Sequence, residues 1–347
     1  MSLKDNMYRI KVFIKDRDKK PPFVMVSEFL NLWVSKGNIP MHYFGRFLYR
    51  KRYTNPSDFM DMKQYRAIIF SKRNNEEEYV HLLSNKFLFS LLCEKHSLPT
   101  PAVLSYNMRG NFFYANSLSR ITNLDELIRF FENVFNTTSN ERLFIKSFCG
   151  YGGTEVFLLH REKLKEQLKT FGDTLLTSAF IHQESIEQHA EINKIYPSSV
   201  NTIRFETYID NSGKTNILGT FIRFGANGRV VDNVSSGGFY VPVHPETGTL
   251  LATGIQSMIF GGNEFEKHPD TNFEFEGFKI PFFDEAKALC IKLTKYVPNR
   301  LAGWDIAITP TGPIVIEGNH TPGITVGEIG YGGYVKHPLF TEMISKS

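Results

Sequence analysis

The sequence contains few cysteines and tryptophans and no long apolar run. Its 347 residues include only 3 Cys and 2 Trp. The cysteines, Cys93, Cys149 and Cys290, are widely spaced and odd in number, which predicts neither a disulfide framework nor a zinc site and favours a reducing cytoplasm. No apolar stretch reaches the roughly eighteen residues of a membrane-spanning helix. The N-terminus is charged throughout and lacks the apolar segment of a secretory signal.

Acidic residues are scarce near the N-terminus. Residues 1–75 hold 16 Lys and Arg against 6 Asp and Glu, a net charge of +10, although the whole chain carries only +4. An aromatic stretch, 42–49, precedes the cluster Arg50-Lys51-Arg52. We favour a solvated helical surface with its aromatics turned inward, and keep peripheral contact of residues 1–75 with an anionic membrane as the alternative. No nucleic-acid module is recognisable and the pI of 8.7 is mildly basic, so no nucleic-acid partner is expected.

The remaining composition is that of a globular protein, with 41% hydrophobic and 22% charged residues. Residues 1–80 are expected to be mostly helical, and residues 244–283 to form a long insertion with little periodicity. Helices followed by antiparallel meanders predict an α+β protein in several layers. Periodicity and turn residues predict helices over 86–95, 123–136, 161–171 and 284–297, and strands over 142–148, 155–160, 179–184, 201–210, 215–225, 229–233 and 238–243.

Two β-branched segments near the C-terminus flank the turn Thr311-Gly312-Pro313 and predict a β-hairpin. Glu317 and Asn319 are two residues apart, so they should share one face of the second strand. If the strands pair around the turn, Asp305 lies beside them. Two carboxylates and an amide oxygen suit Mg²⁺, which takes its other ligands from water and phosphates. The alternative is a surface hairpin with solvated acids.

A glycine-rich turn at 150–153 follows the predicted strand that carries Lys146. Glycine lets backbone N–H groups approach a phosphate closely, and the Lys146 ammonium could reach the same group. The spacing is not that of a Walker phosphate loop, and a hairpin surrounds it, so that class of site is excluded.

The order of these features resembles the ATP-grasp superfamily, in which two antiparallel-sheet α/β subdomains clasp ATP. Lys86 before Leu98-Pro99-Thr100-Pro101, and Lys146 before the glycine turn, resemble the two phosphate-binding lysines of the superfamily. The segment 181–186 resembles the strand end whose backbone meets adenine. The resemblance implies that the nucleotide is bound by Lys86, Lys146, Gly150, Gly152, Gly153, Gln183, Glu184, Ile186 and Glu191, with Glu187 as the competitor of Glu191 for ribose, and the metal by Asp305, Glu317 and Asn319.

The middle of the chain is similar to the glutamate-adding ligases of this superfamily, and several motifs, such as VVDNVSSGG and AGWDIAI, resemble the branch associated with sugar transfer. By this resemblance Arg223 and Arg204 stabilise charge on the transferring phosphoryl group. The D-alanine ligases carry an arginine where this chain has Gly303. The expected substrate contacts are Asn233, Gly237, Gly238, His268, His320 and Thr321, with Asn233 alternatively a turn residue and either histidine alternatively a general base.

The resemblance implies an ATP-dependent carboxylate–amine ligase that forms an amide through an acylphosphate. The cofactors would be ATP and one or two Mg²⁺ ions, which Mn²⁺ could replace, and the substrates a sugar acid of a polysaccharide precursor and an amino acid or amino alcohol. The implied organisation is a basic helical extension (1–80), a smaller subdomain with the glycine lid (81–185) and a larger one (186–347). The larger subdomain would carry the metal site and the insertion 244–283, a candidate for recognising the acceptor. The alternatives are a kinase that phosphorylates a sugar or polyol hydroxyl, and a binding module without activity.

Overall fold

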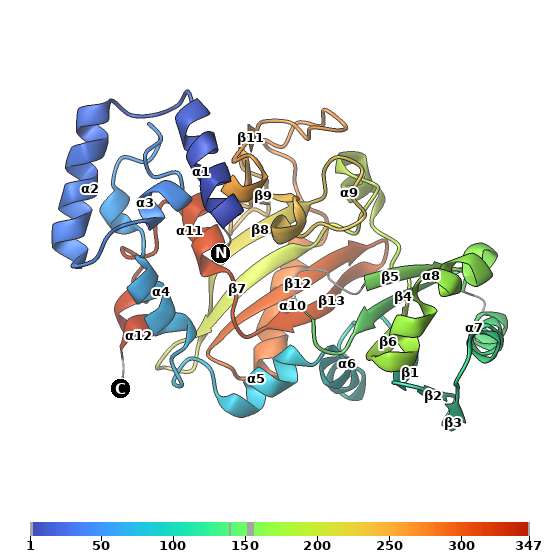
Figure 1. Ribbon diagram of the computed structural model, residues 1–347. Coiled ribbons are helices and arrows are strands. Elements are labelled where there is room, and N and C mark those ends of the chain that lie inside the picture. Colours follow the sequence, from blue (N-terminus) through green and yellow to red (C-terminus); the bar gives the residue numbers. More distant parts are fainter. Residues whose placement is uncertain (1–2, 139, 151–155, 346–347) are drawn as a thin grey trace.

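Two antiparallel β-sheets, each covered by helices, make up most of the computed structural model, which describes residues 3–138, 140–150 and 156–345 (Figure 1). None of the helices in those ranges is both long and apolar enough to pass through a bilayer. The sheets confirm the predicted α+β class. In the described residues before the first strand there are six α-helices: α1 (Leu3–Lys15), α2 (Pro22–Lys36), α3 (His42–Gly45), α4 (Met62–Ile69), α5 (Glu77–Ser84) and α6 (Lys86–Lys95).

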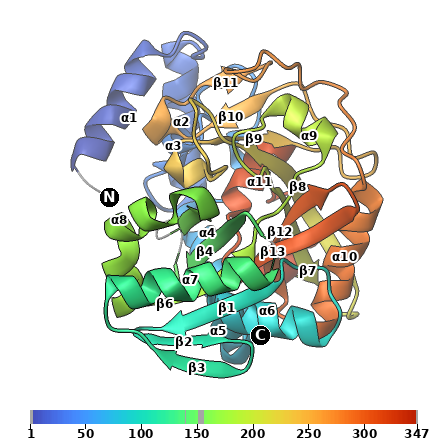
Figure 2. The ribbon, with the colours of Figure 1, turned by 90° about the vertical axis from the view of Figure 1, so that its right-hand side faces the viewer.

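The smaller sheet has the strand order β3-β2-β1-β6-β4-β5. Helices α7 (Leu124–Thr138) and α8 (Leu164–Thr177) pack on one face of it, where Phe131 and Leu168 meet Ile145 in a core of their own (Figure 2). Because side chains alternate along a strand, Lys146 leaves β4 on the opposite face. The strands are β1 (Val103–Met108), β2 (Asn111–Tyr114), β3 (Ser117–Arg120), β4 (Arg142–Ser147), β5 (Val156–His160) and β6 (Ala179–Glu184).

The larger sheet has the order β11-β10-β9-β8-β7-β12-β13. On one face α10 (Phe283–Tyr296) buries Leu289 and Leu293 against Phe205 and Trp304, while α11 (Ile324–Tyr331) covers the other. Two short helices, α9 (Ala190–Ile195) and α12 (Phe340–Ile344), complete this part. The strands are β7 (Ile203–Ile209), β8 (Thr215–Phe224), β9 (Phe239–Pro242), β10 (Gly254–Gln256), β11 (Glu264–Phe265), β12 (Leu301–Thr309) and β13 (Gly312–Asn319).

Helix α6 begins at Lys86 because Asn85 caps it. The Asn85 Oδ1 accepts the backbone N–H groups of Phe87 and Leu88, each at 3.1 Å, which satisfies two free donors of the first turn. The helix then stacks Phe89 on Trp304, with 6.2 Å between ring centroids. Segment 81–100, which the sequence analysis grouped with the smaller subdomain, therefore packs against the larger sheet.

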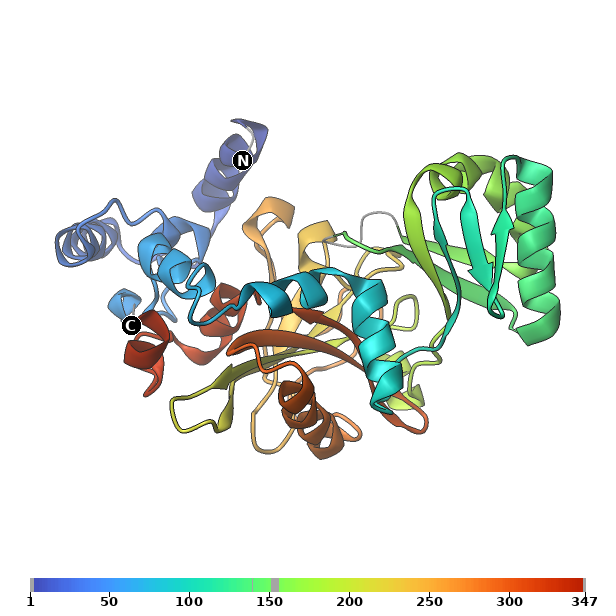
Figure 3. The ribbon, with the colours of Figure 1, turned by 90° about the horizontal axis from the view of Figure 1, so that it is seen from below.

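The chain enters and leaves the smaller sheet through two neighbouring residues. The Glu184 N–H donates to the Ala102 carbonyl at 3.1 Å, and the Ala102 N–H donates to Glu184 Oε1 at 2.9 Å. Among the described residues, the hydrophobic cores of the two sheets have no member in common. Figure 3 shows the smaller sheet at one end of the molecule and the N-terminal helices at the other.

Two sequence predictions in the larger sheet differ from the structure. No strand forms at 229–233, because its polar groups bind elsewhere: Tyr196 donates to the Arg229 carbonyl, and Asp232 accepts from Thr202. The segment 244–283 carries β10 and β11, and its Phe275 lies in the core. It extends the sheet and is not a loose insertion.

The N-terminal helices form a small core that is joined to the larger sheet. The aromatic residues Tyr43, Phe47 and Tyr49 are buried there, which confirms the favoured interpretation that they turn inward. The buried Arg46 guanidinium donates to Glu328 on α11 at 2.5 Å, and Arg50 donates to the Gly262 carbonyl at 2.7 Å. These contacts hold the region against the body of the protein.

Candidate active site

The predicted C-terminal hairpin is present, and a register shift between Asp305 and Ile306 brings Asp305 beside Glu317 as expected. Asp305 on β12 stands opposite Glu317 on β13, and Gly303 stands opposite Asn319. The Asn319 amide donates to Glu317 Oε1 at 3.3 Å, so the two side chains share a face as their spacing predicted. The hairpin thus gathers two carboxylates and an amide at one place.

Both candidate phosphate-binding lysines reach this hairpin from outside the larger sheet. The Lys86 ammonium lies 3.6 Å from Glu317 Oε2 and donates to the Gly150 carbonyl at 2.5 Å. Lys146 extends from β4 and donates to the Ile316 carbonyl of β13 at 3.3 Å. Burial lowers the pKa of Lys146 to about 8, although the Glu317 carboxylate opposes that shift. The site therefore lies at the junction of the two sheets.

Two arginines of the larger sheet meet at Asp305. Arg204 on β7 donates through Nε to Oδ1 at 2.5 Å and through Nη2 to Oδ2 at 3.0 Å, and Arg223 Nη2 lies 3.0 Å from Oδ2. Burial raises the pKa of Asp305, but the two guanidinium groups outweigh it and hold this pKa below its ordinary value. Asp305 is therefore an anion clamped between two cations.

The donor set fits a hard divalent cation with Glu317 as its most accessible ligand. A carboxylate offers about four lone-pair positions, and the guanidinium groups use three of those on Asp305, which leaves one on Oδ1. The Glu317 side chain is 28% exposed, and its neighbour Asn319 adds an amide. All three donors are oxygens, as Mg²⁺ and Mn²⁺ prefer. Among the residues that the structure describes, no site of three or more His, Cys, Asp or Glu side chains competes with this one.

The residues proposed to meet the adenosine lie near the connection between the sheets. The Gln183 side chain is buried and donates to the Pro101 carbonyl at 2.9 Å, which leaves only its main chain for a ligand. The Glu184 carboxylate accepts a hydrogen bond from the Ala102 N–H. Glu191 lies in the first turn of α9 and pairs with Lys194 at 2.6 Å. Ile186 lies between them and is half-buried.

The structure describes three of the five predicted glycine positions. The Gly150 carbonyl oxygen accepts a hydrogen bond from the Lys86 ammonium, whereas Gly152 and Gly153 lie outside the described residues. Gly237 has a φ of 99°, in the left-handed region. A Cβ on Gly238 would lie 2.6 Å from the Asp232 carbonyl oxygen, so only glycine fits this turn.

The prediction of a substrate-binding role for His268 is wrong. Its side chain is fully buried and stacks on Tyr196, with 4.7 Å between ring centroids. The Asp270 N–H donates to Nδ1 at 3.2 Å, so Nε2 carries the proton and donates to the Gly225 carbonyl at 3.0 Å. Burial lowers its pKa, and neither ring nitrogen is free to act as a general base.

The other predicted substrate contacts lie around the same face of the larger sheet. His320 and Thr321 follow Asn319 and are half-buried, and burial lowers the pKa of His320. The Asn233 carbonyl accepts the Gly238 N–H at 3.1 Å, which gives this residue the turn role that the sequence left open. A ligand role for its side chain stays a prediction.

The sequence analysis missed two residues that position Arg223. Asp232 Oδ2 lies 3.4 Å from Arg223 Nε, and Thr202 donates to the same oxygen at 2.5 Å while its hydroxyl accepts from Arg223. Burial raises the pKa of Asp232, and Arg223 opposes this effect. Asp232 adjoins Asn233 within the VVDNVSSGG motif, and an acid next to the predicted Asn233 was the available signal.

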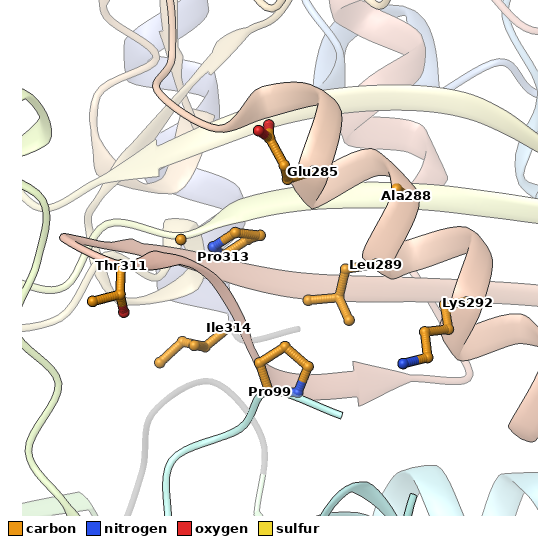
Figure 4. A pocket seen from close by; sticks show the side chains of 9 residues that line it. Pro99, Glu285, Ala288, Leu289, Lys292, Thr311, Pro313 and Ile314 are labelled. Carbon is orange, nitrogen blue, oxygen red and sulfur yellow. The ribbon is translucent and has the colours of Figure 1, made fainter. Parts of the chain in front are cut away.

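Two surface hollows lie away from this constellation. An open pocket of about 400 Å³ between α10 and the β12–β13 turn is lined by Pro99, Glu285, Lys292 and Ile314 among others (Figure 4). A second, beside α7 and α8, is lined by 132–136 and 161–166. Neither contains a predicted site residue, so the chemistry of the sheet junction, and not the shape of these hollows, locates the candidate site.

Comparisons with solved structures give distant similarities. A D-alanyl-alanine synthetase A from Vibrio cholerae is 12% identical with a TM-score of 0.46 and coverage of 78% of this chain and 66% of the other. A D-alanine–D-alanine ligase from Bacillus anthracis is 14% identical with a TM-score of 0.41, and the match covers 76% of this chain and 66% of the ligase. An L-amino acid ligase from Bacillus licheniformis is 12% identical with a TM-score of 0.39, and the match covers 73% of this chain and 43% of the ligase. The chain thus spans less than two thirds of each. No curated protein matches the sequence.

The family comparison is decisive because it covers most of the chain. The sequence model described as sugar-transfer associated ATP-grasp matches residues 65–341. That range includes both lysines, both arginines and the hairpin, and it begins within the basic helical extension predicted for residues 1–80. The chain therefore belongs to the sugar-transfer associated ATP-grasp family.

Proposed function

We propose that this protein is an ATP-dependent ligase that joins a carboxylate to an amine, with a sugar acid of a polysaccharide precursor as the carboxylate. The observation that supports it most is the meeting of Lys86 and Lys146 with Glu317, Asn319 and the arginine-clamped Asp305 at the sheet junction. Cations for phosphates and oxygen ligands for a metal then lie together. The proposed compartment is the cytoplasm, where the free thiols would stay reduced.

Each side chain has a defined part in the proposed reaction. Lys86 and Lys146 bind the phosphates, and Glu317, Asn319 and the remaining lone pair of Asp305 would hold Mg²⁺. The ion, when bound, neutralises charge on the phosphate oxygens. The substrate carboxylate oxygen attacks the γ-phosphorus, and ADP leaves. The amine nitrogen then attacks the acyl carbon of the acylphosphate, phosphate departs, and the nitrogen loses a proton.

Arg223 is the residue best placed to stabilise charge during both steps. Asp305, Asp232 and Thr202 hold its guanidinium on three sides, so it keeps one orientation, and these neighbouring acids raise its pKa against the effect of burial. A fixed cation needs no reorganisation when negative charge develops beside it. The acceptor is proposed to bind on this face, near Gly237 and Gly238.

Hydroxylamine trapping tests the reaction class. With MgATP and a uronic acid such as glucuronate, the ligase should release ADP and give a hydroxamate, because hydroxylamine captures an acylphosphate. Lys146→Met should lower kcat/KM by about 100-fold or more through loss of a charge-assisted phosphate contact, while Lys169→Met on the outer surface of α8 should not. A stable phosphoester without hydroxamate would show a kinase. Calorimetry without detectable MgATP binding would contradict both activities.

A further inference from the structure

Exposed apolar side chains are concentrated on the first two helices. Eleven of the eighteen large hydrophobic residues that are exposed in the described chain lie between residues 7 and 41. On α2, Phe23, Val26, Leu30 and Trp33 recur every three or four residues, so they form one stripe along the helix. Their exposure ranges from 47% for Trp33 to 75% for Phe23. This face of α2 has no partner in the described structure.

The same stripe pattern occurs on α1, with basic residues beside it. Met7, Ile10 and Ile14 follow helical spacing and are at least 56% exposed. Lys11 and Lys15 are exposed and lie one turn apart next to them. The opposite side of α1 carries Val12 and Phe13, which pack into the N-terminal core. The helix is therefore amphipathic on its outside, with an apolar stripe bordered by ammonium groups.

The exposed charge of this region is almost entirely positive. Its acids are used internally: Asp16 pairs with Arg50 and Glu28 with Lys20, both at 2.8 Å, and Asp61 caps α4. Among the described side chains of residues 7–75, Asp18 is the one exposed acid. The exposed basic residues are Lys11, Lys15, Arg17, Lys51, Arg52, Lys63, Arg66 and Lys72, of which Arg52 also meets Glu264.

We propose that α1 and α2 form a surface that docks on an anionic lipid bilayer. Apolar stripes bordered by lysine are the features by which helices lie in a membrane interface, and basic residues add attraction to anionic headgroups. A second copy of this chain would bring like charges together, and a nucleic acid would leave the apolar stripes uncovered. An anionic bilayer complements both the charge and the apolar face.

The position of these helices suits such contact. They lie at the end of the molecule opposite the smaller sheet (Figures 1 and 3), so docking leaves the junction of the sheets accessible. The contacts of Arg46 with Glu328 and of Arg50 with Gly262 fix the region to the body. Docking through α1 and α2 would therefore hold the whole protein at the bilayer. This inference does not depend on the reaction proposed above.

The fluorescence of the two tryptophans can report docking on a bilayer. Trp33 lies in the stripe of α2, whereas Trp304 is fully buried in the core of the larger sheet. Adding phosphatidylcholine vesicles that contain phosphatidylserine to the full chain should shift the emission to the blue, and brominated lipid should quench it. Trp33→Phe should abolish both responses, because Trp304 is out of reach. Vesicles of phosphatidylcholine alone should give a much weaker response.

Matched variants separate the contributions of charge and apolar surface. Lys11→Glu with Lys15→Glu should lower the partition coefficient about 25-fold or more, since each lysine contributes about fivefold near an anionic surface. Lys165→Glu with Lys169→Glu, an exposed pair at the same spacing on α8, should change it little. Val34→Glu should lower it about tenfold or more, and Leu118→Glu, 60% exposed on β3, should not.

Three outcomes would overturn the proposal. One is no sedimentation of the full chain with phosphatidylserine vesicles at low salt, and another is equal binding to neutral vesicles. The third is a dimer in analytical ultracentrifugation that Val34→Glu dissolves, without vesicle binding, because the occupant would then be a second copy. MgATP binding, measured in parallel, should stay unchanged in all of these variants.

Discussion

If Lys146 binds phosphate as proposed, its lowered pKa predicts that nucleotide binding is accompanied by proton uptake. Burial lowers this pKa to about 8, so the free protein holds a partly neutral lysine at that pH. A bound triphosphate favours the charged form and raises the pKa again. We expect MgATP binding at pH 8 to take up about half a proton, measured as a dependence of the calorimetric enthalpy on the ionisation heat of the buffer. A binding-competent Lys146→Arg variant should show no uptake, and equal uptake by both proteins would contradict this assignment.

Two buried glutamates should make the stability of the protein depend on pH near neutrality. Burial raises the pKa of both Glu206 and Glu328 to about 7. Glu206 accepts from the Tyr334 hydroxyl at 2.7 Å and has one oxygen without a partner, whereas Glu328 pairs with the buried Arg46. Between pH 4.5 and 7 the folded protein holds these protons and the unfolded chain releases them. The free energy of unfolding therefore falls as pH rises through this range.

Both glutamine variants are expected to weaken this pH dependence. Glu206→Gln removes an unfavourable charge at pH 8, so it should stabilise the protein relative to the unmodified chain, by an amount on the order of 1–3 kcal/mol. Glu328→Gln imitates the neutral carboxyl that the folded protein holds below pH 7, so it too should reduce the fall in the free energy of unfolding between pH 5 and pH 8. Urea denaturation at pH 5 and pH 8 measures both. An unchanged difference between the two pH values in both variants would show that charge burial is not the controlling factor.

Among the larger elements, the β12–β13 hairpin packs tightly against α5. A Cβ on Gly318 would lie 2.5 Å from Leu83 Cδ2 and 2.8 Å from Trp304 Cζ3. Gly318→Ala forces these core side chains to move and should cost about 1–3 kcal/mol. In Gly323→Ala the new methyl would meet Val326 at an ordinary 3.6 Å, so its free energy of unfolding should change by about 0.5 kcal/mol or less. Chemical denaturation compares the two, and equal costs would mean that the helix α5 yields to the extra atom.

The hairpin also shows what sequence reasoning could and could not predict. Alternation along a strand placed Glu317 beside Asn319, and the Gly/Pro turn brought the two strands together, because both are local properties. The register that starts at the turn would pair Asp305 with Ile316, and the shift between Asp305 and Ile306 that places Glu317 opposite Asp305 could not be predicted from it. The clamp of Asp305 by Arg204 and Arg223 joins residues about a hundred positions apart, and the spacing of residues carries no information on such contacts. Glu206 lies two residues from Arg204 on the same strand face, so strand periodicity could have drawn attention to it.

The failed predictions have the same physical origin. His268 was assigned by its place in a motif, yet stacking on Tyr196 and two hydrogen bonds make it part of the core. Helix α6 was assigned by its place in the chain order, but Phe89 packs on Trp304 of the larger sheet. In both cases long-range packing decided the position, whereas the elements with strong local patterns, such as β6 at 179–184, were predicted with their bounds.

At the scale of the whole molecule, the chain enters and leaves the smaller sheet through the neighbouring residues Ala102 and Glu184, and this sheet also contacts the rest through the Lys146–Ile316 hydrogen bond and the stack of Phe87 on Phe148. Within the described residues the two hydrophobic cores share no side chain, so we expect segment 103–183 to be removable as a unit whose two ends meet. Replacing it with a short glycine–serine linker should leave the remaining protein folded, with Trp304 still emitting from a buried environment. A red-shifted emission would mean that this segment is required for folding. If the excision succeeds, the corresponding segments of other chains could be grafted at the same point, which would exchange the strand that carries Lys146 while Lys86 and the β12–β13 hairpin stay in place.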